Sequence, residues 1–355
     1  MKSLTEMDRL LGELARKDEF SGVVRLTRSD KELFSAAYGY ANRPWKIKNN
    51  PDTRFDTASV TKLFTAAAVL QLLDEKQLSF DTRIVDFLDL KNTAVSPEVT
   101  VFHLLTHTSG IGDDCEEEDG EIYENVWRAK PNYSVTATAD FLPRFVHKKP
   151  NFEPGTGCRC CNCSYVLLGL AIEKITGLTY REYVQEHIFT RLGMDRTAFL
   201  RLNGVSENVA EGYAPVRDED GNITGWRKNI YAYPPVGSPD SGAYTTAGDL
   251  GRFMRDLIGG KLLSPELTDD LLKPKALYRS DDDYERRYGY GFEFLLDKKT
   301  GKIISFRKSG VNTGVCAWTE HFVEPDITLA AFGNYDECLW KPLKDMQKMI
   351  IAGNL

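Results

Sequence analysis

Several features are scarce in this 355-residue sequence, and each absence narrows what the protein can do. Acidic residues outnumber basic ones by 52 to 45, and no basic stripe offsets the net charge of −7, so nucleic acid is not an expected partner. No apolar run is long enough to cross a bilayer. Four of the five histidines have no metal-like spacing: His103, His147, His187 and His321.

The first twenty residues lack the uninterrupted apolar core of a signal peptide. They have the period of an amphipathic helix. Its apolar face consists of Leu4, Met7, Leu10, Leu11 and Leu14. Seven cysteines, an odd number, suit a reducing compartment better than a disulfide framework. We therefore expect a cytoplasmic protein, while a leader removed before residue 1 would leave the same sequence.

Strand patterns lie near the two ends of the chain, and helical patterns lie between them. Residues 21–41 predict a hairpin that turns at Ser29-Asp30. Three more strands are predicted over 302–308, 315–323 and 326–334, followed by a helix over 336–355. Helical periodicity occurs over 59–76, 100–108, 134–148, 164–177, 179–193 and 246–260.

This order predicts an α+β fold in which both termini build one antiparallel sheet flanked by the terminal helices. A mainly helical subdomain, residues 61–239, would be inserted between the halves 1–60 and 240–355 of the sheet subdomain. The sequence does not indicate an oligomeric state.

Ser59 and Lys62 stand at the start of the first internal helix, three positions apart and therefore on one helical face. The positive end of the helix dipole favours a developing alkoxide at such a serine. A partly buried lysine can lose enough proton affinity to act as a base. The pair is a candidate activated nucleophile that needs no histidine. Such pairs also arise by chance on many helices, where the serine only caps the helix.

The surrounding sequence favours the catalytic interpretation. The stretches "RFDTASVTKLFTAAAVLQLLDEKQLSFD" and "TVFHLLTHTSGI" resemble the serine beta-lactamase and penicillin-binding-protein superfamily, above all its class C-like esterases and D-amino-acid peptidases. The resemblance continues through "RKSGVNTGVCAW" and covers roughly residues 20 to 335. It implies a serine hydrolase that acts through an acyl-enzyme on an ester, amide or beta-lactam bond of a small molecule or short peptide, without a cofactor.

The resemblance also implies roles for residues near the two ends. Ser59 would be the acylated nucleophile and Lys62 its base. The third family motif appears as residues 308–310 on an edge strand, where Lys308 would hold a carboxylate or oxyanion. Ser309 would donate a hydrogen bond, and Gly310 would let the substrate approach the strand. The backbone N–H groups of Ser59 and Val311 would form the oxyanion hole.

The second family motif, Tyr-x-Asn, is altered. The flanks "PGT" at 154–156 and "YVLLG" at 165–169 align without a gap, so the asparagine falls on Asn162 and the tyrosine on Cys160. Asn162 would orient the substrate. A cysteine sulfur lies several ångströms closer to the backbone than a phenol oxygen, so the thiol of Cys160 cannot simply replace the phenol.

Three explanations of the cysteines remain open. Lys62, alone or with a water, could activate Ser59 in a slower hydrolase. The cluster could bind zinc or another thiophilic metal with help from a second segment. The candidate ligands are Cys158, Cys160, Cys161, Cys163 and Cys316. Finally, the cysteines could be buried fillers in a catalytically impaired binding or sensing protein.

Two further stretches receive structural interpretations. The acidic run Asp113 to Glu121 is predicted to be a solvated loop; if it overhangs the cleft, it would favour cationic substrates. His107 and Ser109, in "LLTHTSG", are predicted to support a helix end and turn.

Overall fold

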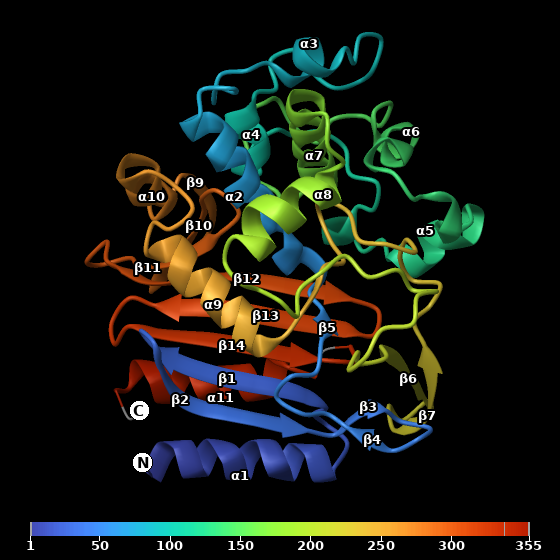
Figure 1. Ribbon diagram of the computed structural model, residues 1–355, viewed down its shortest axis with the longest axis vertical. Helices are drawn as coiled ribbons and strands as arrows, with labels where there is room; N and C mark the ends of the chain where they lie inside the picture. The colour runs from blue at the N-terminus through green and yellow to red at the C-terminus, as the bar shows by residue number, and fades with distance from the viewer. Residues whose placement is uncertain (1, 337, 354–355) are drawn as a thin grey trace.

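The computed structural model describes residues 2–336 and 338–353. Its centre is an eight-stranded antiparallel sheet with the order β2-β1-β14-β13-β12-β11-β10-β9 (Figure 1). The strands are β1 (Gly22–Arg28), β2 (Lys31–Tyr38), β9 (Ala276–Ser280), β10 (Tyr284–Tyr288), β11 (Glu293–Asp297), β12 (Ile303–Asn312), β13 (Val315–Phe322) and β14 (Ile327–Gly333). Both ends of the chain contribute to this sheet, as the sequence predicts.

Three two-stranded sheets and the helices complete the fold. The short pairs are β3 (Tyr40–Asn42) with β4 (Ile47–Lys48), β5 (Phe55–Asp56) with β8 (Tyr244–Thr245), and β6 (Tyr213–Arg217) with β7 (Ile223–Lys228). The α-helices are α1 (Lys2–Arg16), α2 (Thr61–Asp74), α3 (Ile84–Leu88), α4 (Val101–Leu105), α5 (Tyr123–Ala129), α6 (Leu142–Phe145), α7 (Asn162–Thr176), α8 (Tyr180–Val184), α9 (Ala247–Ile258), α10 (Pro265–Leu271) and α11 (Trp340–Ile351).

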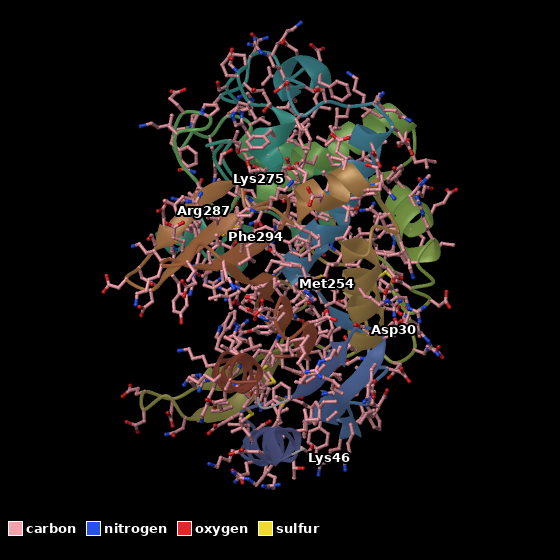
Figure 2. The ribbon with its side chains drawn as sticks, turned by 90° about the vertical axis from the view of Figure 1, so that its left-hand side faces the viewer. Asp30, Lys46, Met254, Lys275, Arg287 and Phe294 are labelled. Carbon is pink, nitrogen blue, oxygen red and sulfur yellow. The ribbon has the colours of Figure 1, made fainter. Side chains whose placement is uncertain are left out.

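The two faces of the sheet are covered differently, because successive side chains of each strand point to opposite faces. In β14, Leu329 and Ala331 pack with α1 and α11, whereas Ala330 and Phe332 pack with α2 and α9. Seen from the side, α1 lies at one end of the molecule and the helical region at the other, with Met254 of α9 between them (Figure 2). The cleft described below forms on the α2 side.

The predicted elements at the two ends are present, but one region of the sheet is not anticipated. The hairpin β1–β2 and the strands β12, β13 and β14 match their predicted positions. Strands β9 to β11 were not predicted, because the run Asp281–Asp283 and the neighbouring arginines obscure the alternation of apolar residues. The helix predicted over 134–148 is broken into short turns around Pro143.

The position of β12 corrects an expectation, because this strand is not at the edge of the sheet. It pairs with β13 from Ser305 to Asn312, but its pairing with β11 ends at Arg307. From Lys308 onward, one side of the strand is therefore open. Although β12 lies inside the sheet, the segment that carries the third family motif is therefore unpaired on one side, as an edge strand would be.

In the described part of the chain, no helix combines the length and apolarity needed to span a membrane.

Candidate active site

A strained turn presents the nucleophile candidate. Ala58 has a φ of +42°, in the region that side-chain-bearing residues rarely adopt. The carboxylate of Asp56 holds this turn by accepting the Ala58 N–H at 2.7 Å. Burial raises the pKa of Asp56 to about 7. Ser59 follows in a short 3₁₀ turn and remains half-buried.

Lys62 lies behind the serine and is fully buried. Its Nζ is 2.9 Å from Ser59 Oγ, 2.6 Å from Asn162 Oδ1 and 3.0 Å from the carbonyl oxygen of Asp240. In a neutral amine, two N–H groups can serve the two carbonyl acceptors while the lone pair faces the hydroxyl. The arrangement therefore suits proton removal from Ser59.

Gly310 places β12 directly against the nucleophile turn. A Cβ atom at this position would lie 2.2 Å from the carbonyl oxygen of Thr57 and 3.0 Å from the backbone nitrogen of Ser59. Only glycine permits this approach. It brings Val311, the next residue of the open strand edge, beside the Ser59 turn, as an oxyanion hole made of these two residues requires.

The helix α7 begins at Asn162 and is fixed there by Asp113. The two carboxylate oxygens of Asp113 accept the backbone N–H groups of Asn162 at 2.8 Å and Cys163 at 3.0 Å. A negative charge at a helix N-terminus is favourable. Asp113 therefore sets the position of Asn162, across 49 residues of sequence.

A chain of hydrogen bonds continues from Asn162 away from Lys62. The Asn162 amide donates to Tyr123 Oη at 2.8 Å, and the Tyr123 hydroxyl donates to Asp114 at 2.7 Å. Asp114 is also paired at 3.4 Å with Arg144. The chain orients the Asn162 oxygen toward Lys62. Sequence reasoning missed Tyr123, because nothing local marks it.

The prediction that Asp113 to Glu121 form a solvated loop is wrong for the first half of this run. Asp113 and Asp114 are only 4% and 5% exposed. Burial, reinforced by Asp114, raises the pKa of Asp113 to about 7. Glu117 reaches the cleft, where its carboxylate accepts a hydrogen bond from the Asn162 amide at 3.1 Å. Although Glu117 as a whole residue is exposed, desolvation of its carboxylate in the cleft raises the pKa of Glu117.

Cys160 lies in the wall of the cleft, and within the described residues its sulfur is not hydrogen-bonded to Ser59 or Lys62. The three partners of Lys62 do not include its sulfur. The Cys160 backbone donates to Glu118 at 3.4 Å, and the side chain is partly exposed. Position 160, where the family has a tyrosine, therefore provides no phenol hydroxyl near Ser59.

The other sulfurs of the cluster point to separate partners. The thiols of Cys158 and Cys161 contact the carbonyl oxygens of Thr106 and Ile111. Cys316 lies on the opposite face of the sheet, in the core formed with α1 and α11. Among the described residues, no three cysteine sulfurs come within reach of one metal ion.

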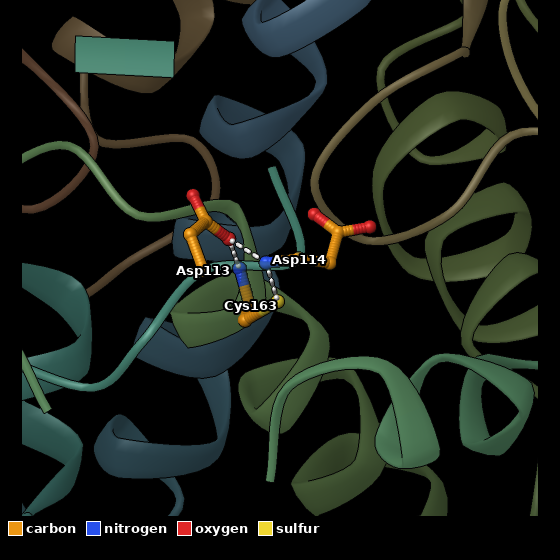
Figure 3. Close-up of side chains that lie close together, drawn as sticks. All are labelled: Asp113, Asp114 and Cys163. Carbon is orange, nitrogen blue, oxygen red and sulfur yellow. Dashed lines mark hydrogen bonds between the residues drawn. The ribbon is translucent and has the colours of Figure 1, made fainter. Parts of the chain in front are cut away.

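One group of potential metal ligands does lie close together in the described chain: Asp113, Asp114 and Cys163 (Figure 3). All three are already engaged. Asp113 caps α7, Asp114 is paired with Arg144, and the Cys163 sulfur accepts the Asp114 N–H at 3.2 Å. We interpret the group as structural support for Asn162.

Lys308 borders the other side of the cleft. It is 4% exposed, and within the described residues its ammonium has no hydrogen bond or ion pair. Its Nζ lies 5.7 Å from the centre of the Tyr288 ring. Burial lowers the pKa of Lys308.

His107 lies closer to the candidate active site than its predicted role at a helix end implies. Its Nδ1 accepts the Cys161 N–H at 3.2 Å, and its ring packs against Tyr165 and Tyr288. Burial, together with the charges of Lys308 and Lys62, holds the pKa of His107 well below its usual range. The imidazole is therefore neutral and supports the wall between the two lysines.

Ser59 lies between two hollows that differ in charge. A small cavity of about 40 Å³ carries three acidic side chains, Asp56, Glu117 and Asp240, and no described basic residue other than Lys62 behind it. The larger, open groove is rich in basic residues: Lys308, Arg279, Arg286, Arg307 and Lys344. Glu117, Ser59 and Val311 border both.

Comparisons with known proteins agree with this geometry. The sequence model of the beta-lactamase family matches residues 7–337. Penicillin-binding protein 4* of Bacillus subtilis is 25% identical over 343 residues, covering 92% of this chain and 71% of that protein. Protein flp of Staphylococcus aureus is 28% identical over 215 residues, 59% of this chain. That match spans only 41% of the staphylococcal protein.

Solved structures share the whole fold. A penicillin-binding protein from Bacillus halodurans is 33% identical, with a TM-score of 0.86 over 95% of this chain and 99% of that one. The D-amino acid amidase of Ochrobactrum anthropi, solved with L-phenylalanine, is 20% identical, with a TM-score of 0.78 over 98% and 99% of the two chains. Because the family match covers nearly the entire chain and the nucleophile geometry fits it, this protein belongs to the beta-lactamase family.

Proposed function

We propose that this chain is a serine hydrolase that forms an acyl-enzyme on Ser59 and cleaves an ester, amide or beta-lactam bond. The observation that carries the proposal is the buried amine of Lys62, held by two carbonyl oxygens with Ser59 Oγ as its third neighbour at 2.9 Å. Among the described residues, no other titratable side chain is hydrogen-bonded to this hydroxyl. Lys62 is therefore the base in our proposal.

The reaction follows from this placement. Lys62 takes the proton as Ser59 Oγ bonds to the acyl carbon, and the oxyanion receives the N–H groups of Ser59 and Val311. The Lys62 ammonium then returns the proton to the leaving group. Lys308 and Asn162 orient the substrate beside the open edge of β12. Hydrolysis of the acyl-serine by water, with Lys62 again as base, restores the enzyme.

A fluorophosphonate probe tests this proposal directly. We expect stoichiometric labelling that maps to Ser59 and disappears in Ser59→Ala, while the exposed-serine control Ser206→Ala labels like the wild type. A correctly folded protein that takes no label would contradict the proposal.

The charge around the nucleophile supports a substrate class. The cavity beside Ser59 carries Asp56, Glu117 and Asp240, and the open groove carries Lys308. We propose that substrates carry an ammonium or similar cation on the cavity side and tolerate an anion on the groove side. Short peptides and amides of amino acids have this distribution of charge.

A second candidate function rests on Cys160. Within the described residues no tyrosine hydroxyl is hydrogen-bonded to Lys62, and in this second candidate the chain binds such ligands without efficient turnover. The variant Cys160→Tyr separates the two candidates in a screen of esters, D-amino-acid amides and beta-lactams. A gain of orders of magnitude over a barely active wild type favours a binding protein; similar rates in both favour a hydrolase that works without the phenol.

A further inference from the structure

The thiol of Cys160 differs from those of the other six cysteines. Five of them are buried, and Cys158, which is partly exposed, directs its sulfur to the Thr106 carbonyl oxygen at 3.7 Å. The sulfur of Cys160 has no hydrogen-bond partner within the described residues, although its side chain is partly exposed. It borders the large groove together with Ser59 and Lys308. Cys160 is thus the cysteine that a reagent in the cleft meets first.

The neighbouring ammonium supplies a second, independent observation. Lys308 is only 4% exposed, has no acceptor in the described structure, and borders the same groove. Burial lowers the pKa of Lys308, and a negative charge on Cys160 acts in the opposite direction. Because both residues border one groove, the ammonium can hold an anionic reagent beside this thiol.

The groove itself favours anions. Its five basic residues face three acidic ones: Glu117, Glu118 and Glu293. One of these acids is already engaged, since Glu293 is hydrogen-bonded to Arg307. Arg279, Lys344 and Lys308 form no described ion pair, so the groove keeps an uncompensated positive charge. Such a field raises the local concentration of small anions.

We propose that Cys160 is a modification site that exchanges with small anionic disulfides and thereby closes the cleft. The Cys160 thiolate attacks one sulfur of the disulfide, and a new sulfur–sulfur bond forms as the old one breaks. The electron pair leaves with the second half as a thiolate, which takes up the proton that Cys160 has lost. The attached group lies in the groove beside Ser59 and Lys308. A small thiol reverses the reaction by the same exchange.

The proposal is tested with two aliphatic disulfides of opposite charge, 3,3′-dithiodipropionate and cystamine. Each rate of adduct formation is measured by intact mass and divided by the rate for the urea-unfolded chain, which removes the difference in intrinsic reactivity. We expect one adduct, mapped to Cys160, and a normalised rate at least about tenfold higher for the dicarboxylate. Equal normalised rates, or an adduct that maps to Cys158, would overturn the proposal.

Three variants sharpen the test. Cys160→Ser should lose the fast adduct, and the matched variant Cys158→Ser should keep it. Lys308→Met should slow the dicarboxylate selectively; an unchanged ratio of rates would contradict the role of the ammonium. In the wild type the adduct should block fluorophosphonate labelling of Ser59, and dithiothreitol should restore it. If the unmodified protein takes no fluorophosphonate, the proposed hydrolase fails, but the mass measurement still decides the modification.

Discussion

Two buried lysines flank Ser59, and their surroundings differ sharply. Lys62 is fully buried with three oxygen atoms around its Nζ, whereas Lys308, 4% exposed, has none among the described residues. Leaving a buried charge without a partner costs free energy. The difference fits the proposed function, in which Lys62 is the base and Lys308 binds an anionic group of the substrate.

The largest expected effect comes from removing the partnered lysine. Lys62→Met keeps the volume but loses the base, so acylation of Ser59 should slow by about 10³-fold. Fluorophosphonate labelling kinetics measure this rate, with exposed Lys302→Met as the control. Thermal unfolding must show that the variant is folded, because two carbonyl oxygens lose their donor. Labelling within a few-fold of the wild type would assign the base to another group.

Gly310 lies where β12 meets the turn before Ser59, and its substitution is expected to have the next largest effect. In Gly310→Ala the new methyl group would clash with the Thr57 carbonyl, so β12 must move away from the turn. Loss of one oxyanion donor should lower kcat by about 10²-fold.

The matched control for this substitution is Gly251→Ala in helix α9, where a Cβ atom meets nothing within 4 Å. This change should leave turnover intact and slightly stabilise the protein. Equal turnover of both variants would show that the contact between β12 and the turn is not needed for catalysis.

The region around Lys62 could be predicted from the sequence only in part. Ser59 and Lys62 are recognisable because their relation is local, one helical turn apart. Asn162 follows from its flanking "PGT" and "YVLLG". The supports of Asn162 do not follow, because a run of acids is typical of solvated loops and the contact between Asp113 and α7 spans 49 residues.

In the region around Lys308, the motif could be identified from the sequence, but its geometry could not be predicted. The segment 308–310 is identifiable as a motif, and the open edge beside it was expected. That edge comes instead from the early end of β11 pairing at Arg307, within a strand interior to the sheet. The pairing of β12 depends on strands β9 to β11. Their charged residues conceal the alternation of apolar positions that would predict these strands.

Glu117 borders both the acidic cavity and the basic groove, so its neutralisation tests whether charge sets the selectivity for substrates. Glu117→Gln retains a side chain of similar shape but removes one negative charge beside Ser59. We expect kcat/KM for an ammonium-bearing ester to fall about tenfold relative to its neutral isostere, an effect of about 1.4 kcal/mol. Glu219→Gln, in an exposed turn, controls for net charge. An unchanged ratio would remove Glu117 from substrate recognition.

The last prediction concerns the stability of the region around Lys62 and not the rate of the reaction. Burial raises the pKa of Asp56 from its reference of 3.8 to about 7, so the folded state holds this proton more tightly than the unfolded one. Ionisation of Asp56 must therefore cost stability as the pH rises from about 4 to about 7, by up to about 1.4 kcal/mol for each pH unit in that interval. Asp56→Asn keeps the oxygen that accepts the Ala58 N–H but cannot ionise. The variant should gain thermal stability over the wild type between pH 5 and pH 8, with the difference levelling off above pH 7. A difference independent of pH would mean that ionisation of Asp56 does not destabilise the folded turn before Ser59.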